Sequence, residues 1–367
     1  MKFFIKILLV LSLFQFGASA HANDHINTVA DFAHIIDFGS NRVLMSKNAD
    51  SPMKPASMAK IMTLYIVFSR IAEGSLTLQD EFLVSEKAWK MGGSRSFLDV
   101  GTRVSVEELI NGIAVQSGND AAVVVAEGIS GSEEAFADEM NSFARQLGMD
   151  DTNFTNSTGW PDEMLTTTAR DLSLLAAAII RDFPIDKFPN LYPVFAKPHH
   201  TYNNIKQPNR NPLINRSPGA DGLKTGSTKE SGYGLVGSAE RNGQRIILVL
   251  NGLESKKQRA LESNRLMEFM FREFKKYNFF KAGETVKIAN VWLGKEPTIS
   301  MVLKEDLAKV LSRKERNNTK LTVNYNNPIQ APIAAGEEVG TLWFEVNGVR
   351  EEIPLISREG VSQLPVF

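Results

Sequence analysis

The sequence predicts an α/β (α+β) fold, in which an antiparallel sheet is flanked by helices and a small β-rich domain follows. Three observations support this prediction. Residues 57–182 contain a series of apolar helical patterns. Residues 222–251 then read as three strands, the last two joined by Asn242-Gly243, a strong hairpin signal. From Gly283 onward, short alternating segments lie between Gly, Pro and Asn clusters, which is typical of a separate β-rich unit.

Each element of the first domain follows from its own pattern. Residues 33–37 and 42–45 alternate around a Gly-Ser-Asn turn and predict two strands. Residues 57–72 are apolar on almost every side, which indicates a buried helix. The proline-rich residues 183–218 predict a loop. Further helices are expected at residues 105–115, 119–129, 132–148, 168–182 and 256–277, and strands at 222–227, 233–240 and 245–251.

The N-terminus predicts export. Lys2 and Lys6 precede an apolar run over residues 7–16, and small residues follow up to Ala20. This order is that of a cleaved secretory signal peptide, and the run is shorter than the ~20 residues of a spanning helix. We therefore divide the chain into a signal peptide at 1–20, a first domain at 21–282 and a β-rich domain at 283–367.

Composition excludes several classes of function. The 367 residues carry 41 Lys and Arg against 42 Asp and Glu, so the basic surplus of a nucleic-acid-binding protein is absent. Cysteine is absent, which excludes a cysteine nucleophile, a cysteine-ligated metal and disulfides. The pair His199-His200 has no metal-ligand spacing and is expected to be a polar loop element. We expect no metal and no organic cofactor.

Three short motifs carry the chemistry. They are Ser57-Met58-Ala59-Lys60, Ser117-Gly118-Asn119 and Lys224-Thr225-Gly226. In this order they form the signature of serine β-lactamases and penicillin-binding proteins. The first is expected on a helix, the second in a loop between helices and the third on a strand. Each motif is weak alone, and their order and context together make the signal specific.

A second Ser-x-x-Lys, Ser51 to Lys54, is excluded by local physics. Pro52 and Pro55 prevent a continuous helical turn there. Ser57 and Lys60 instead open the buried helix and share one face. Free N–H groups and the helix dipole at that end favour a developing negative charge. The alternative is that Ser57 serves only as a helix N-cap.

Beyond the three motifs, further stretches strengthen a family resemblance. They are Gln116 to Ala121, Thr167 to Leu172 and Asn209 to Asn211. With them the sequence resembles the low-molecular-weight penicillin-binding proteins, specifically the serine D-alanyl-D-alanine carboxypeptidases of peptidase family S11. The resemblance covers roughly residues 28–360. It implies a β-lactamase/transpeptidase-like domain and the family's second, β-rich domain.

The resemblance assigns the catalytic roles. Ser57 would attack the carbonyl of the penultimate D-Ala of a peptidoglycan stem peptide and expel the terminal D-Ala. Lys60 would be the general base, since burial and the nearby ammonium of Lys224 both lower a lysine pKa. Ser117 would relay a proton to the leaving amine. Asn119 would orient Lys60 and the substrate amide.

The remaining residues are expected to bind substrate. The backbone N–H groups of Ser57 and Ser227 would form the oxyanion hole. The strand with Lys224, Thr225 and Gly226 would pair with the extended peptide. Thr225 and Arg210 are candidates for its terminal carboxylate. The alternative for Arg210, which lies in a Pro/Asn loop, is a solvated side chain. β-Lactam antibiotics would acylate the same serine and so inhibit the enzyme.

Three alternatives to a carboxypeptidase stay open. A class A β-lactamase would use a Glu-x-x-Leu-Asn motif, which is absent between Ser117 and Lys224. A D,D-endopeptidase relative would tend to lack the β-rich domain. A non-catalytic wall-binding protein would not need the intact motifs.

The last residues bear on location. Family members often end in an amphipathic helix on the membrane surface, whereas residues 362–367 include Pro365 and leave no room for one. We expect an exported protein in the periplasm or at the outer face of the cytoplasmic membrane, without membrane attachment through such a helix.

Overall fold

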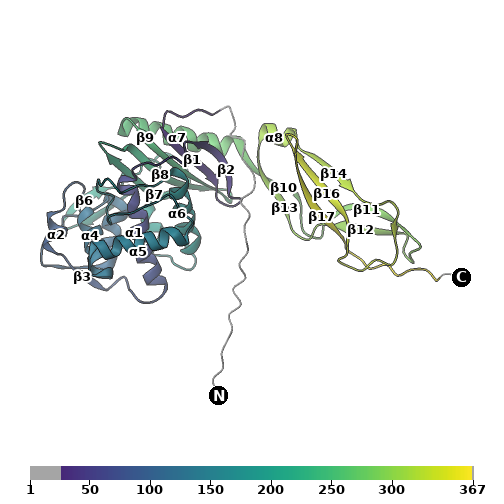
Figure 1. Cartoon of the computed structure of the whole chain (residues 1–367), viewed down its shortest axis with the longest axis horizontal. Helices are drawn as coiled ribbons and strands as arrows, with labels where there is room; N and C mark the ends of the chain where they lie inside the picture. Colours follow the sequence, from purple (N-terminus) through teal and green to yellow (C-terminus); the bar gives the residue numbers. More distant parts are fainter. Residues whose placement is uncertain (1–25, 366–367) are drawn as a thin grey trace, which may run out of the picture.

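The structure is a computed structural model that describes residues 26–365, so the signal peptide predicted at 1–20 lies outside the described residues. Figure 1 shows a larger part that combines a sheet with helices and an elongated β-rich part beside it. The helices are α1 Lys60–Ala72, α2 Glu86–Lys90, α3 Val106–Asn111, α4 Asn119–Ser130, α5 Glu133–Gln146, α6 Ala169–Asp182, α7 Lys256–Glu273 and α8 Arg313–Asn317.

The strands of the larger part are β1 Phe32–Asp37, β2 Arg42–Lys47, β3 Glu81–Leu83, β4 Arg103–Ser105, β5 His199–Tyr202, β6 Ile205–Pro208, β7 Ala220–Thr228, β8 Gly232–Arg241 and β9 Gln244–Leu253. Those of the β-rich part are β10 Phe274–Phe280, β11 Thr285–Trp292, β12 Thr298–Val302, β13 Leu307–Ser312, β14 Lys320–Asn324, β15 Ile329–Gln330, β16 Glu338–Val346 and β17 Val349–Ser357.

The central sheet has five antiparallel strands in the order β2-β1-β9-β8-β7, with β7 at one edge. Side chains of β9 alternate between the two faces, as strand geometry requires. Ile247 and Val249 belong to the core that includes α1 and α6, and Leu248 belongs to the core that includes Leu266 of α7. The predicted antiparallel sheet between helices is therefore confirmed.

The buried helix predicted at 57–72 begins differently from the expectation. Residues Ala56–Ala59 form a 3-10 turn, and α1 starts only at Lys60. From Lys60 to Phe68 every residue of α1 is buried, as its apolar pattern indicates. The helix predicted at 105–115 likewise divides into α3 and a π-helical turn over Gly112–Gln116.

Two other predictions need correction. The region 183–218 is not only loop, because it contains a 3-10 helix at Tyr192–Ala196 and the hairpin β5–β6. The helix predicted to reach residue 277 ends at Glu273, and β10 follows immediately. Phe274 is buried and pairs with Ser312 of β13, so tertiary pairing overrides the helical pattern of the last residues.

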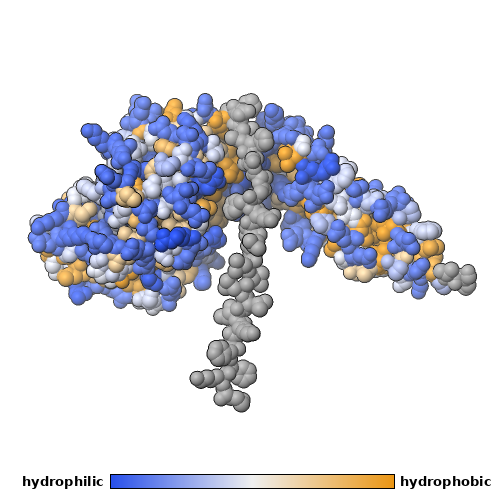
Figure 2. Space-filling view, in the orientation of Figure 1, coloured by the Kyte–Doolittle hydropathy of each residue, from blue (hydrophilic) through white to orange (hydrophobic). Residues whose placement is uncertain are grey.

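The β-rich part consists of the β10–β13 pair and a six-stranded sheet in the order β14-β16-β17-β12-β11-β15. It confirms the predicted second unit, and the boundary at residue 283 remains a prediction. Arg42 at the edge of the central sheet donates to Val310 O and Glu315 across the junction. Figure 2 shows apolar surface on the β-rich part. The exposed large hydrophobic residues of this part include Ile288, Trp292 and Leu293. Among residues 26–365, no helix is long and apolar enough to span a bilayer.

Candidate active site

The three sequence motifs meet at one cavity of about 410 Å³. It lies where the 3-10 turn before α1, the turn before α4 and the edge strand β7 come together. Residues of all three motifs line it, with cationic side chains from elsewhere in the chain. The lining residues are Ser57, Ser94, Ser117, Pro208, Asn209, Arg210, Thr225, Gly226, Ser227, Lys256 and Arg259.

Ser57 is held at the cavity by close backbone packing on two sides. A Cβ at Gly226 would lie 2.8 Å from Pro55 O, and one at Gly159 would lie 1.8 Å from Ala56 O. Both glycines therefore let their segments approach the turn more closely than any other residue allows. Ala56, just before the serine, has φ +47°, an uncommon backbone conformation for a residue with a Cβ.

Lys60 lies one turn further in and is fully buried. Its Nζ lies 3.1 Å from Ser57 Oγ. It also donates to Asn119 Oδ1 at 2.7 Å and to Thr158 O at 2.7 Å. The hydrogen bonds to Asn119 and Thr158 therefore hold the amine in a position next to the Ser57 hydroxyl. The Thr158 carbonyl was missed by sequence reasoning, because a backbone oxygen leaves no residue-type signal.

The pKa of Lys60 is lowered to about 7, first by burial and then by the positive charge of Arg210, while Asp120 and Glu133 oppose these effects. The burial expected from the sequence is the largest cause, and Arg210 is a cation that the sequence did not indicate. The expected repulsion between Lys60 and Lys224 is present as well, as a lowering of the pKa of Lys224. An amine with this pKa is substantially neutral near pH 7 and can accept a proton.

Ser117 and Asn119 flank the turn between the π-helical turn and α4. Ser117 adopts a left-handed conformation with φ +70°, and its Oγ is buried with no hydrogen-bond partner among the described residues. Asn119 accepts from Lys60 and donates through Nδ2 to Gly92 O at 2.8 Å. The amide of Asn119 thus connects Lys60 to the loop on the other side of the cavity.

Asp120, the residue directly after Asn119, fixes that loop in place. Its carboxylate is fully buried and accepts from Ser96 N at 2.7 Å and from Leu98 N at 3.3 Å. Three residues within the four positions 117–120 therefore serve the site: Ser117 offers a free hydroxyl, Asn119 an amide that holds Lys60, and Asp120 a carboxylate that fixes the opposite loop.

Lys224 and Thr225 lie on β7 and are buried. Lys224 Nζ donates to Thr225 O at 3.2 Å. Burial, followed by the charges of Lys60, Arg210 and Arg259, lowers the pKa of Lys224 well below its ordinary value. The structure thus brings both lysines of the motifs into one buried electrostatic environment.

Three cationic side chains line the cavity, and among residues 26–365 no Asp or Glu lines it. We refer to these three, Arg210, Lys256 and Arg259, as the cationic wall. Arg210 is exposed and donates to Ser94 Oγ across the cavity. Arg259 of α7 is buried, lies with its guanidinium 5.8 Å from the Tyr233 ring centroid, and has an Nε without a partner among the described residues. Burial lowers the pKa of Arg259 to about 10. Sequence reasoning missed Arg259, since no motif surrounds it.

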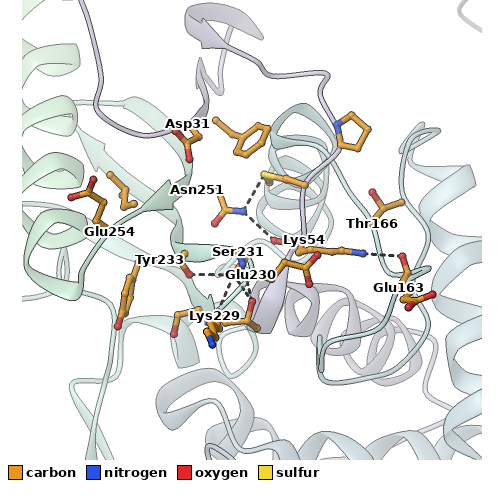
Figure 3. Close-up of a pocket in the computed structure, with 18 of the residues that line it drawn as sticks. Asp31, Lys54, Glu163, Thr166, Lys229, Glu230, Ser231, Tyr233, Asn251 and Glu254 are labelled. Carbon is orange, nitrogen blue, oxygen red and sulfur yellow. Dashed lines mark hydrogen bonds between the residues drawn. The ribbon is translucent and has the colours of Figure 1, made fainter.

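A larger groove of about 1100 Å³ adjoins the cavity and shares Ser227 with it. Figure 3 shows its wall, where Lys54 extends toward the loop that carries Glu163. Lys54 Nζ donates to the carbonyls of Asp162, Glu163 and Leu165 at 2.9–3.1 Å. Lys54, the lysine of the excluded Ser-x-x-Lys, thus holds the loop of residues 162–165 in place and has no contact among the described residues that would activate a serine.

Within residues 26–365, no cluster of three or more His, Asp or Glu side chains is arranged to hold a metal ion. The expectation that the enzyme uses neither metal nor cofactor remains a prediction from its motifs.

Two family models match the chain. The one described as D-alanyl-D-alanine carboxypeptidase (Peptidase_S11) covers residues 18–255. The one described as penicillin-binding protein 5, C-terminal domain, covers residues 274–363. Together they span both parts of the structure.

Individual relatives match from about two thirds to almost all of the chain. The D-alanyl-D-alanine carboxypeptidase DacF of Bacillus subtilis is 34% identical over 99% of this chain and 95% of its own. The crystal structure of the carboxypeptidase DacD from Francisella tularensis superposes with a TM-score of 0.78 at 30% identity, covering 92% of this chain and 95% of that one. Penicillin-binding protein D2 from Listeria monocytogenes, in its ampicillin-bound form, gives a TM-score of 0.61 at 28% identity over 68% of this chain and all of that one.

Proposed function

This chain belongs to the S11 family of serine-type D-alanyl-D-alanine carboxypeptidases, which are penicillin-binding proteins, and we propose that Ser57 is its nucleophile and Lys60 its general base. One observation carries this proposal. A fully buried amine lies 3.1 Å from the hydroxyl of a serine that lines a cavity open to substrate.

In the acylation step, neutral Lys60 takes the proton of the Ser57 hydroxyl as the oxygen attacks the carbonyl of the penultimate D-Ala. The ammonium formed donates to Asn119 Oδ1 and Thr158 O, both 2.7 Å from Nζ. These two acceptors stabilise the charge that proton transfer creates, so Lys60 needs no rearrangement during the step.

Ser117 completes the proton path. Its Oγ is buried, lines the same cavity and has no partner among the described residues, so it is free to donate to the leaving amine. The proton taken by Lys60 replaces the one that Ser117 gives up. The peptide bond breaks, the terminal D-Ala leaves as the free amino acid, and an ester on Ser57 remains.

The tetrahedral intermediate carries an oxyanion. We assign its stabilisation to the backbone N–H groups of Ser57 and Ser227, two residues that line the cavity. A water molecule then attacks the ester, and Lys60 accepts the proton of that water and returns it to Ser57 Oγ as the ester bond breaks. The shortened stem peptide leaves as a carboxylic acid, which ionises in solution.

The terminal carboxylate of the substrate fits the cationic wall. Thr225, Arg210 and Arg259 line it together, and no acidic side chain does. Arg259 is the stronger anchor of the two arginines, because it is buried and its Nε is unpartnered, whereas Arg210 is exposed. A guanidinium in this setting binds a carboxylate with charge-assisted hydrogen bonds.

The rest of the stem peptide would follow the edge of the sheet. Strand β7 is an edge strand with a free side, and Lys224 to Ser227 lie on it. An extended peptide that pairs with this edge runs past Ser227 into the groove of Figure 3. The groove therefore accommodates the residues on the acyl side of the bond that is cut.

β-Lactam antibiotics would acylate Ser57. The ampicillin-bound form of the Listeria protein D2 supports this part of the proposal by similarity. Penicillins carry a carboxylate beside a strained amide. The cationic wall would bind this carboxylate and Ser57 would attack the carbonyl of this amide, as both do in the peptide.

We also propose that the protein acts outside the cytoplasm after removal of residues 1–20. The residues between Lys2 and Ala20 have the pattern of a cleaved signal peptide. The mass of the mature chain, measured after cell fractionation, tests this: cleavage after Ala20 supports it, and full-length chain in the cytosol overturns it.

The experiment on the nucleophile uses a diacyl-Lys-D-Ala-D-Ala peptide and a fluorescent penicillin. Ser57→Ala is expected to lose both D-Ala release and penicillin labelling. Ser51→Ala, in the excluded Ser-x-x-Lys, is the matched control and should retain both. Labelling of Ser57→Ala at the wild-type rate would show that another residue is acylated. Labelling of the wild type without release of D-Ala would identify a penicillin-binding protein that is not a carboxypeptidase on this substrate.

A further inference from the structure

The buried carboxylate of Glu133 contacts the segment of Ser157 and Thr158, whose Thr158 carbonyl accepts from Lys60. Glu133 is the first residue of α5 and is only 8% exposed. Its Oε1 accepts from Ser157 Oγ at 2.8 Å and from Ser157 N at 3.3 Å. Its Oε2 lies 3.1 Å from Lys87 Nζ. The carboxylate therefore fixes Ser157 through both the side chain and the backbone.

Ser157 directly precedes the carbonyl that Lys60 uses. Thr158 O accepts from Lys60 Nζ at 2.7 Å. On the other side, Ser157 O accepts from Thr63 Oγ1 of α1 at 2.7 Å. The segment that leads into Thr158 is thus anchored to both α5 and α1, one peptide unit before the carbonyl that accepts from the amine.

The same carboxylate also acts on Lys60 through its charge. Three charged groups act on Lys60: Arg210 of the cationic wall, Asp120 of α4 and Glu133 of α5. Lys224 of β7 lies in the same buried environment. Glu133 and Asp120 favour the ammonium form of Lys60, while Arg210 and burial favour the neutral amine.

We infer that Glu133 is a positioning residue for the general base: it aims the Thr158 carbonyl at Lys60 and stabilises the ammonium that forms when Ser57 loses its proton. This inference rests on the proposed role of Lys60. It assigns a catalytic purpose to a helix residue that lies outside the three motifs and does not line the cavity.

The chain provides a closely matched control, Glu134. It is the next residue of the same first turn, and its Oε1 lies 3.2 Å from the same Lys87 Nζ. Its side chain is 77% exposed. Glu134→Gln thus removes a helix N-terminal charge and an ion pair with Lys87, as Glu133→Gln does, but leaves Ser157 untouched.

The test measures the second-order rate of acylation by a fluorescent penicillin from about pH 5 to about pH 9.5, where a general base gives an acid limb. Glu133→Gln keeps an acceptor for Ser157 and loses the charge. We expect its acid limb to move down by roughly 0.5–1 pH unit, with the plateau rate reduced several-fold. Glu134→Gln should leave both the limb and the plateau unchanged.

Glu133→Ala removes the acceptor as well, and its plateau should fall by roughly 10- to 100-fold. Thermal melting verifies that each variant is folded, and the pH limb distinguishes the inference from a purely structural role. An unmoved limb in Glu133→Gln, or an equal shift in Glu134→Gln, overturns the inference. Lys60→Arg that acylates at the wild-type rate would instead overturn the proposed role of Lys60, so the two failures are distinguishable.

Discussion

The amide oxygen of Asn119 lies 2.7 Å from the Nζ atom of Lys60, while the amide nitrogen of Asn119 donates to Gly92 O at 2.8 Å. One uncharged side chain thus connects the amine that we propose as the general base with the loop that carries Gly92. Its neutrality matters, because a negative charge at this place would favour the ammonium form of Lys60.

Asn119→Asp should therefore raise the pKa of Lys60. The acid limb of penicillin acylation is expected to move up by roughly 1–2 pH units, so that acylation at neutral pH falls about tenfold or more and recovers in alkaline buffer. Asn119→Ala removes the hydrogen bond without adding charge, and its limb should not move up. Equal limbs for the Asp variant and the wild type would mean that Asn119 does not act on the charge of Lys60.

Lys60 should also make stability depend on pH. Burial lowers its pKa from 10.5 to about 7 in the folded chain, so the unfolded chain binds one more proton between these values. The contribution of Lys60 to the free energy of unfolding therefore rises as the pH rises from about 7 to 10.5. Between about pH 7 and about pH 9, the unfolding free energy of the wild type should rise by about 2–3 kcal/mol relative to Lys60→Met.

Urea unfolding of both proteins at the two pH values measures this difference. The comparison with Lys60→Met cancels the titrating groups whose pKa does not depend on the charge of Lys60. A constant difference across the window would show that Lys60 has an ordinary pKa in the folded chain.

Gly226 controls the distance between β7 and the turn that carries Ser57. A Cβ there would lie 2.8 Å from Pro55 O and 3.1 Å from Met58 Cγ, and the backbone oxygen cannot move without moving the turn. Gly226→Ala should reduce penicillin acylation by roughly 100-fold and lower stability by about 1–3 kcal/mol. Gly39→Ala is the control, because its Cβ would meet only Asp37 Oδ1 at 3.8 Å. Acylation by Gly226→Ala at the rate of the control would contradict this account of the close approach.

Arg259 should recognise the terminal carboxylate of the peptide. Arg259→Gln is expected to reduce kcat/KM for a D-Ala-D-Ala peptide by roughly 10- to 100-fold, mostly through KM. A peptide ending in a D-alaninamide lacks the carboxylate and should be affected much less. Lys257→Gln removes a charge from the same helix outside the cavity lining and serves as the control. Equal losses on the acid and the amide would place the carboxylate elsewhere.

Local sequence patterns predicted much of this molecule for clear reasons. The buried helix and the antiparallel sheet follow from periodicity, and Ser57, Lys60, Ser117 and Lys224 belong to motifs whose residue types carry the chemistry. The order of the three motifs was sufficient to expect that they meet in space.

What the sequence could not predict depends on tertiary contacts. Arg259 reaches the cavity from α7, and Glu133 reaches Ser157 from α5, each without a motif. Thr158 contributes only a backbone carbonyl. The strand β10 replaces the end of a helical pattern because Phe274 pairs with Ser312, a partner far along the chain. Such contacts are decided by packing and not by local propensity.

The central claim is that Lys60 is a neutral amine near pH 7 and can take the proton of Ser57. An NMR titration of the chain labelled with 13C at lysine Cε, with the Lys60 signal assigned by its absence in Lys60→Arg, measures this most directly. The account predicts that this signal titrates with a midpoint of about 7. A midpoint near 10.5, the ordinary lysine value, would leave the amine charged at neutral pH and would contradict its role as the base.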